Sequence, residues 1–320
     1  MFYFDIHGHR EGVMNMLRRL PGPALPPDVP LGLLKGSGVG GLALCVIGDP
    51  GSFMPIKIDP YRGVIKDLEA TKKIAIDAGG SVALDPTDLE AAAQNGGLGF
   101  VLGIEGGDFL KEDLVRLDTV FARGARLLVL VHYSKNKIGS ISYGWGGRAI
   151  PASERTGLTG FGKAVIARAN ELGMIIDLAH ADEETIAGAL DCSSSPMLCS
   201  HTGPRALQDF PRYISDVAIR GIAKAGGLIG LWTFFNKGRG VADLRTFAEY
   251  AAHCAEIAGS EHIAIGSDVN GVPGNMAGYG SILDSSRILE ALAEKGFSES
   301  EIAGIAGLNF LRFYKGLNNL

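Results

Sequence analysis

Several features that would assign this chain to a class are scarce in its 320 residues. The four cysteines form no CxxC pair and no zinc-ribbon spacing, so we interpret Cys45, Cys192, Cys199 and Cys254 as buried thiols of a reducing compartment. No run of Lys or Arg stands out, and the net charge is −5. A nucleic-acid partner or an anionic membrane surface is therefore not expected.

Long hydrophobic runs are also missing. No apolar segment reaches about 18 residues, the length that a transmembrane helix needs. The N-terminus, Met-Phe-Tyr-Phe-Asp-Ile-His, lacks the basic start and the apolar stretch of a signal peptide, and the C-terminus has no lipid-anchor signal. We therefore expect no membrane partner and a cytoplasmic location.

Glycine, in contrast, is abundant at 46 residues, and many glycines lie beside short apolar runs, where tight turns need them. The apolar runs, which predict strands, cover residues 2–6, 42–47, 99–104, 125–131, 174–178, 196–199, 228–232 and 263–266. Helical patterns between and after them cover residues 64–78, 111–123, 160–172, 183–190, 216–225, 241–258, 281–295 and 298–311.

This alternation is typical of an α/β fold with a parallel sheet. Eight strands with interleaved helices favour a (β/α)₈ TIM-type barrel over the alternative, a doubly wound sheet. We expect residues 1–320 to form a single catalytic barrel domain. Residues 133–157 are expected to be a long loop. Residues 36–41 match GxGxxG, but they precede a strand and open no helix, so we interpret them as a loop and not as a dinucleotide site.

Polar residues gather where the predicted strands end. Catalytic groups of barrel enzymes lie at the C-terminal ends of strands. Five of the seven histidines closely follow a predicted strand, as do one Glu and one Asp. These residues are His7, His9, Glu105, His132, His180, His201 and Asp268. His253 lies within a helical pattern and His262 precedes a strand, so we interpret both as structural or exposed.

The residue types in this set suit a transition metal. Side chains alternate along a strand, so His7 and His9 point to the same side and could reach one cation at about 2.1 Å. Imidazole suits Zn, Fe, Ni or Co rather than Ca or Mg. Glu105 could bridge two cations, or could be an exposed turn residue. Asp268 could take a proton from a metal-bound water, or could cap a helix.

His132 remains open between three roles. It is followed by Tyr133 and the long loop, which suggests the rim of a pocket. There it could bind a metal or donate to the oxyanion of a tetrahedral intermediate, or it could be structural.

The order of several segments resembles the renal (membrane) dipeptidase family of the amidohydrolase superfamily. The resemblance spans nearly the whole chain, and its matching segments are DIHGH (5–9), GIEGG (103–107), GLTGFG (157–162), IDLAH (176–180), CSH (199–201), GSDVNGVP (266–273) and GLNFLR (307–312). The DLAH, SH and GSDxxGVP segments are the most specific of these. A homodimer is also what this family suggests.

The resemblance implies a binuclear, usually zinc, site. Glu105 would bridge the metals, with His7 and His9 on one metal and His180 and His201 on the other. His132 would contact the substrate and stabilise the oxyanion, and Asp268 would transfer the proton. Arg212 falls where the family holds the substrate carboxylate, a role that suits a guanidinium; its alternative is an exposed loop residue.

Two residues depart from the family pattern. His9 stands where the family has Asp, so one metal should bind more weakly because an anionic ligand is replaced by a neutral one. Asn270 stands where Asp is frequent, which would alter the contacts behind the ligands.

The leading hypothesis is a zinc-dependent dipeptidase that cleaves the peptide bond of dipeptides through a metal-bound hydroxide, with one or two divalent cations. One alternative is a related amidohydrolase that acts on another amide, a lactam or a lactone. The other is a catalytically weak barrel that binds a small ligand or a metal.

Overall fold

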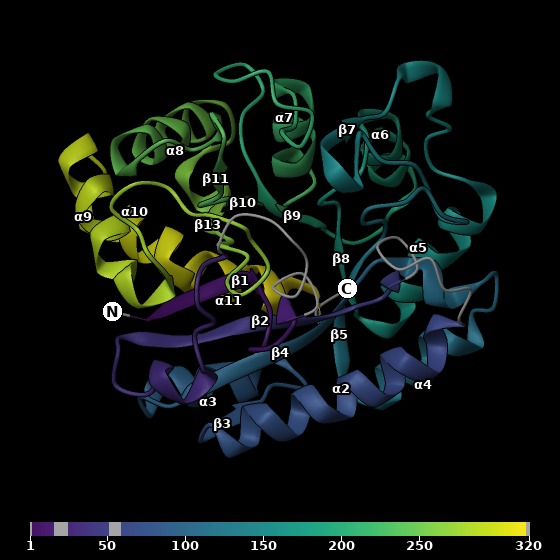
Figure 1. Ribbon diagram of the computed structural model, residues 1–320, viewed down its shortest axis with the longest axis horizontal. Coiled ribbons are helices and arrows are strands. Elements are labelled where there is room, and N and C mark those ends of the chain that lie inside the picture. The colour runs from purple at the N-terminus through teal and green to yellow at the C-terminus, as the bar shows by residue number, and fades with distance from the viewer. Residues whose placement is uncertain (1, 16–24, 51–58, 318–320) are drawn as a thin grey trace.

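Eight parallel strands form the centre of the molecule in a computed structural model, of which residues 2–15, 25–50 and 59–317 are described. Helices surround these strands (Figure 1). The barrel strands are β1 (Tyr3–Gly8), β2 (Val39–Ile47), β4 (Leu98–Glu105), β5 (Ala125–Val129), β8 (Ile175–Asp177), β9 (Leu198–Thr202), β10 (Leu228–Leu231) and β13 (Ile263–Ile265).

Each barrel strand pairs with its successor in this order, and the ring is nearly closed between its ends. The backbone N–H of His9 donates to Val269 O at 2.8 Å, and the N–H of Asp268 donates to His7 O at 3.0 Å. These bonds join the end of β1 to the segment that follows β13. The fold is therefore a TIM-like α/β barrel, and the predicted fold class is confirmed.

The helices follow the strands and pack around them. They are α2 (Pro60–Asp77), α3 (Pro86–Gln94), α4 (Val115–Ala122), α5 (Gly160–Leu172), α6 (Glu183–Cys192), α7 (Asp216–Lys224), α8 (Leu244–Ala258), α9 (Ser285–Lys295), α10 (Glu299–Ala303) and α11 (Asn309–Leu317). Short polar side chains start several of them: Asp182 accepts from Thr185 N, and Asp243 accepts from Thr246 N. Such caps satisfy backbone donors that the first helical turn leaves free.

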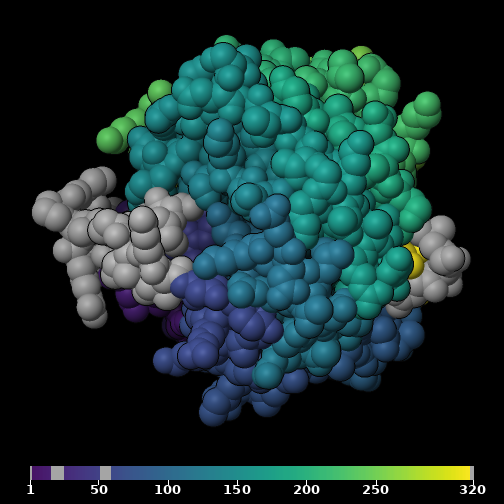
Figure 2. All heavy atoms as spheres, turned by 90° about the vertical axis from the view of Figure 1, so that its right-hand side faces the viewer, coloured from purple at the N-terminus to yellow at the C-terminus, as the bar shows by residue number. Residues whose placement is uncertain are grey.

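The strand side chains and the inner helix faces form a continuous apolar core. Close strand packing requires glycine at Gly41, where a Cβ would lie 1.8 Å from Gly99 O. Residues of the middle of the chain, in teal, cover much of one face of the molecule, above the blue N-terminal part (Figure 2). Among the described residues, no helix combines the length and the apolar character that crossing a membrane requires.

All eight predicted strands overlap the observed ones, but the sequence analysis missed several smaller elements. Strand β3 (Gly80–Val82) and helix α3 were not predicted, and β3 pairs with β4 outside the ring. The predicted loop 133–157 contains a hairpin of β6 (Tyr143–Gly144) and β7 (Arg148–Ala149). The predicted helix 298–311 is divided by a π-helical turn, Gly304–Leu308, which separates α10 from α11.

The structure also bears on the cysteines, on two histidines and on the GxGxxG segment. Cys192 is exposed, so it was wrong to expect four buried thiols; the other three are buried. His253, on α8, lies 3.0 Å from Asp216 Oδ1, and His262, directly before β13, lies 2.7 Å from Gly227 O. The GxGxxG segment opens no helix, and its second half is the start of β2.

Candidate metal centre

The seven polar residues predicted from the strand ends converge at one end of the barrel. His7, Glu105 and His201 lie within β1, β4 and β9. The other four directly follow a strand or lie a few residues beyond it: His9, His132, His180 and Asp268. All seven side chains are buried. Parallel strands of a barrel bring their C-terminal ends to one rim, which explains why residues so distant in sequence meet.

The Glu105 carboxylate is at the centre of this group. Its Oε1 atom lies 3.1 Å from His180 Nε2 and 3.3 Å from His7 Nε2. His201 Nε2 lies 3.6 Å from the same oxygen and 3.0 Å from His180 Nε2. Two ring nitrogens that face each other at this distance need a proton or a cation between them. This half of the group therefore has the donors of a metal position.

The other Glu105 oxygen faces a second set of donors. His9 Nε2 lies 3.3 Å from Oε2 and also 3.3 Å from Asp268 Oδ1. His132 Nε2 lies 3.5 Å from Oε2. The two carboxylate oxygens of Glu105 thus face different imidazoles, as a carboxylate between two cations would. His7 lies between the two sets, because it faces Oε1 and also forms a possible ion group with His9.

The donor atoms fit a divalent transition metal. Among the described residues, three groups could hold an ion on geometric grounds: His7 with His9 and Glu105, His7 with Asp177 and His201, and Glu105 with His132 and His180. His7 Nε2 and Asp268 Oδ1 are buried without a hydrogen-bond partner in the described structure. Buried polar atoms are rarely left without a partner, and imidazole nitrogen is a preferred ligand of zinc and its neighbours.

Buried partners fix the orientation of the imidazoles. His9 Nδ1 lies 2.9 Å from Cys45 O, so it carries a proton and donates it, and Nε2 is the nitrogen that faces Glu105. His201 Nδ1 lies 2.8 Å from Ser200 Oγ. Such contacts behind the ligands set the tautomer and hold the ring in place.

Three buried carboxylates that support the site were not singled out from the sequence. Asp49 Oδ1 accepts from His132 Nδ1 at 2.7 Å, and its Oδ2 accepts from Tyr133 N at 3.1 Å. Asp5 accepts from Ser267 N at 2.9 Å, and Asp177 accepts from Ser200 N at 2.9 Å.

Their signals in the sequence differ. Asp5 and Asp177 lie in the DIHGH and IDLAH segments, which could have drawn attention to them. Asp49 belongs to no recognised motif, so nothing in the sequence indicated its partner.

Burial lowers the pKa of these histidines, and neighbouring charges either oppose this effect or add to it. Burial lowers the pKa of His9, but the Asp268 and Glu105 carboxylates outweigh it and raise the pKa to about 9. Burial, together with the Arg212 charge, holds the pKa of His180 well below its usual range. For His132, burial also lowers the pKa, but the charges of Asp49 and Glu105 raise it overall.

Asp268 is held in a strained backbone conformation next to His9. Its φ of 57° lies in the left-handed region, which a residue other than Gly rarely adopts. The turn leaves no space beside the carboxylate, since a Cβ on Gly271 would lie 2.1 Å from Asp268 Oδ1 and 2.6 Å from His9 Cδ2. This contact explains why position 271 of the GSDVNGVP segment is a glycine.

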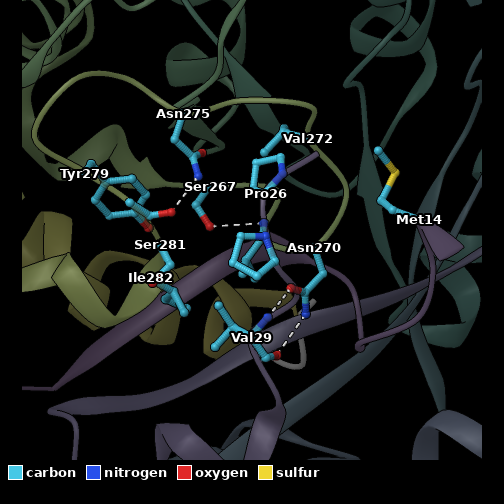
Figure 3. A pocket seen from close by; sticks show the side chains of 13 residues that line it. Met14, Pro26, Val29, Ser267, Asn270, Val272, Asn275, Tyr279, Ser281 and Ile282 are labelled. Carbon is cyan, nitrogen blue, oxygen red and sulfur yellow. Dashed lines mark hydrogen bonds between the residues drawn. The ribbon is translucent and has the colours of Figure 1, made fainter. Parts of the chain in front are cut away.

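Asn270, in the same segment, ties the loop before β2 to the rim of the barrel. Its Oδ1 accepts from Val29 N at 2.8 Å, and its Nδ2 donates to Val29 O and to His9 O, both at 3.0 Å. Figure 3 shows the Asn270 side chain directed at Val29. An amide serves all three contacts because it both donates and accepts.

Arg212 is buried, with 4% of its surface exposed, so its alternative as an exposed loop residue is wrong. Its guanidinium carbon lies 5.0 Å from the centre of the Trp232 ring. Nη2 has no hydrogen-bond partner, and no described carboxylate lies within ion-pairing distance of the guanidinium. A buried cation without a counter-charge is costly, which indicates a place for an anionic ligand.

Two adjoining cavities open onto this centre. One, of about 200 Å³, is lined by His9, Glu105, His132, His180 and Asp268, with apolar walls beyond them. The other, of about 460 Å³, contains Arg212 and shares Asp268 with the first. Tyr133 and Trp145 also line both, so the cavities are continuous.

The fold and this site define a class. A barrel that gathers imidazoles around one buried carboxylate, beside a cavity with a buried guanidinium, has the donor set that a metal-dependent hydrolase would need. The family model of the membrane dipeptidases (peptidase family M19) matches residues 63–320. The chain belongs to this family.

Individual relatives agree with this assignment. Two uncharacterized dipeptidases of Schizosaccharomyces pombe are 27% and 30% identical to the chain, over 79% and 69% of its length. The chain spans only 62% and 53% of those relatives. The chain is also similar to a solved structure, a metallo peptidase from Rhodobacter sphaeroides liganded with a phosphinate mimic of the dipeptide L-Ala-D-Ala. The TM-score is 0.83, with 18% identity and 99% coverage of both chains. At that identity the likeness concerns the fold.

Proposed function

We propose that this protein is a metal-dependent dipeptidase that hydrolyses the peptide bond of a dipeptide. The observation that carries the proposal is the Glu105 carboxylate, surrounded by imidazoles, in a cavity that adjoins the unpaired Arg212 guanidinium. The membrane dipeptidase family and the dipeptide mimic bound to the Rhodobacter relative support the choice of substrate.

His7 and His9 would hold one cation, His180 and His201 the other, and Glu105 would bridge both. We propose zinc, because four of these five ligands are imidazoles. A bound zinc ion would lower the pKa of a water ligand to about 7 and polarise the scissile carbonyl. His9 is neutral as a ligand, so the cation that it holds should be the more weakly bound.

The remaining residues would position the substrate and move the proton. Arg212 would pair with the substrate carboxylate through two parallel hydrogen bonds. Asp268, on the rim beside His9, would accept the proton of the attacking water and pass it to the leaving amine. His132 would donate from Nε2 to the carbonyl oxygen as charge develops, since Asp49 accepts from its other nitrogen.

The test is hydrolysis of a dipeptide panel by protein loaded with zinc, with elemental analysis of the same sample. Free amino acids should appear, and Asp268→Asn should lower kcat at least about 100-fold while zinc content is unchanged. Including N-acyl amino acids, lactams and lactones tests the related amidohydrolase activity. Zinc binding without turnover of any of these compounds would instead support a binding protein. A cytoplasmic location and a homodimer remain predictions.

A further inference from the structure

We propose that the cavity around Arg212 selects dipeptides whose second residue is acidic, Asp or Glu, and whose first residue is apolar. This inference rests on the proposed dipeptidase function and adds a substrate class to it. It depends on charges at the mouth of the cavity, none of which belongs to the seven residues of the metal centre.

The described lining of this cavity has an excess of positive charge. Three cations line it, Arg212, Lys237 and Arg239, against a single carboxylate, Asp268. Arg212 lies buried within the cavity, whereas Lys237 and Arg239 are exposed. If Arg212 takes the α-carboxylate of the second residue, a cationic mouth remains for that residue's side chain.

Lys237 and Arg239 belong to a small hairpin formed by β11 (Phe235–Asn236) and β12 (Arg239–Gly240). Arg239 Nη1 donates to Tyr143 OH, which lies 2.8 Å away on β6. Both residues line the cavity, so this bond holds the guanidinium at its wall, and the guanidinium forms no other hydrogen bond with the described residues.

The hairpin itself is anchored at both strands. Gly240 N donates to Gln208 Oε1 at 2.8 Å, and Phe235 N donates to Gly274 O at 3.2 Å. Neither Lys237 nor Arg239 forms an ion pair with a described carboxylate. Both charges therefore lie at the cavity without an ion-pairing carboxylate among the described residues.

The adjoining cavity, which contains the metal centre, has apolar walls instead of cationic ones. Beyond the metal centre its walls are Val13, Met14, Leu25 and Ile47, together with Pro273. This wall would receive the side chain of the first residue, on the other side of the scissile bond from Arg212. An apolar first residue and an acidic second residue together match both cavities.

The test compares isosteric pairs of substrates. Zinc-loaded wild-type protein is assayed with Leu-Asp against Leu-Asn and with Leu-Glu against Leu-Gln, each with an L or a D second residue. We expect kcat/KM to be at least about tenfold higher for the acidic member, mainly through KM, since the charge contact is present in both ground state and transition state. The ratio should shrink as salt is raised.

The double variant Lys237→Met, Arg239→Gln should reduce this ratio to about threefold or less, with turnover of the neutral members retained. The matched control is Arg245→Gln, Lys295→Met, which removes two positive charges from a separate groove between α8 and α9. It should leave the ratio unchanged.

The outcomes separate the two proposals. Equal cleavage of acidic and neutral members by the wild type, or an unchanged ratio in the double variant, overturns the acidic preference and leaves the dipeptidase function intact. Failure to cleave any dipeptide overturns both.

Discussion

Arg212 and Asp49 illustrate how single residues set the chemistry of this centre. Arg212 is a buried cation that packs on Trp232 and has no described counter-ion. Asp49 is a buried carboxylate that fixes His132 through one oxygen and Tyr133 N through the other. In each case the contact that matters is made by a side chain far from its partner in sequence.

Arg212→Met should lower the activity without lowering the stability of the ligand-free protein. Loss of the guanidinium removes the pairing with the substrate carboxylate, so we expect kcat/KM to fall about 100-fold, or roughly 3 kcal/mol. The ligand-free protein should be as stable as the wild type or more so, because an unpaired buried charge is replaced by an apolar chain. Kinetics and thermal melting measure the two effects. Arg212→Lys is the control for charge; recovery of full activity by Lys would contradict a two-pronged contact.

Asp49→Asn should act on turnover through His132. The amide keeps the shape of the carboxylate but no longer supports a positive charge on the ring, so His132 becomes a poorer donor to the carbonyl oxygen. We expect kcat to fall about 10- to 100-fold with little change in KM or in zinc content. The pH profile of kcat should shift as well, because the pKa of His132 loses a charge that raises it. An unchanged kcat would mean that Asp49 serves folding only.

At the level of elements, loops on the C-terminal rim hold the site by side-chain bonds to the barrel. Asn270 ties the segment before β2 to the end of β1. Asp108, in the short helix Gly107–Leu110 after β4, accepts from Ser134 Oγ at 3.1 Å and from Asn136 Nδ2 at 3.0 Å. These bonds restrain the loops that follow β1 and β5, and with them the walls of the cavities.

Asn270→Asp, the residue frequent in the family, should be harmful here. A carboxylate could still accept from Val29 N, but it would face Val29 O and His9 O without a proton to donate. We expect a loss of about 1–3 kcal/mol in the free energy of unfolding, measured by urea denaturation. Asn270→Gly, which tolerates the φ of 65°, reports the loss of the bonds without the repulsion. Equal stability of Asp and Asn would contradict the assignment of the amide donor.

Asp108 should make stability depend on pH. Burial, with help from the nearby Asp49 charge, raises the pKa of Asp108 to about 6. Between about pH 4 and pH 6 the folded protein binds a proton at Asp108 that the unfolded chain has released. The stabilisation that this proton gives is present at low pH and is lost as pH rises. As pH rises over that range, the free energy of unfolding of the wild type should fall by about 1–3 kcal/mol, and this fall should be absent in Asp108→Asn. Urea unfolding at several pH values measures it, and Asp113→Asn, at an exposed position nearby, is the control.

Over the whole molecule, the centre depends on closure of the barrel. Its metal-ligand candidates come from β1, β4, β9 and the segment after β8, and the ring is nearly closed by the bonds between His7, His9 and the residues after β13. A cation shared by these strands would therefore act as a cross-link around the ring.

Removal of metal should lower the stability of the whole barrel. Zinc at 100 times its dissociation constant would add about 2.7 kcal/mol by mass action, since the unfolded chain lacks the assembled site. The melting temperature should fall in EDTA and recover with zinc. In His180→Ala the recovery should be smaller. His253→Ala, which alters a histidine bonded to Asp216 on the periphery, should recover fully. An identical response of both variants would contradict the assignment of His180 as a ligand.

Much of this molecule could be predicted from local sequence. The short apolar runs identified all eight barrel strands, and the rule that polar residues at strand ends form the site selected Glu105 and the six residues that gather around it. Short elements such as β3 gave too few residues for a period to be recognised. That residues 1–320 form a single domain stays a prediction.

The sequence by itself determined the alternation of strands and helices and the kinds of metal-binding side chain at the strand ends, because both follow from neighbours along the chain. Only the tertiary structure decided that Asp49 holds His132, that Arg212 has no counter-charge among the described residues, and that Lys237 and Arg239 share its cavity. Those relations join segments separated by tens of residues. They arise only when the ring closes and its strands take their register, which no local pattern encodes.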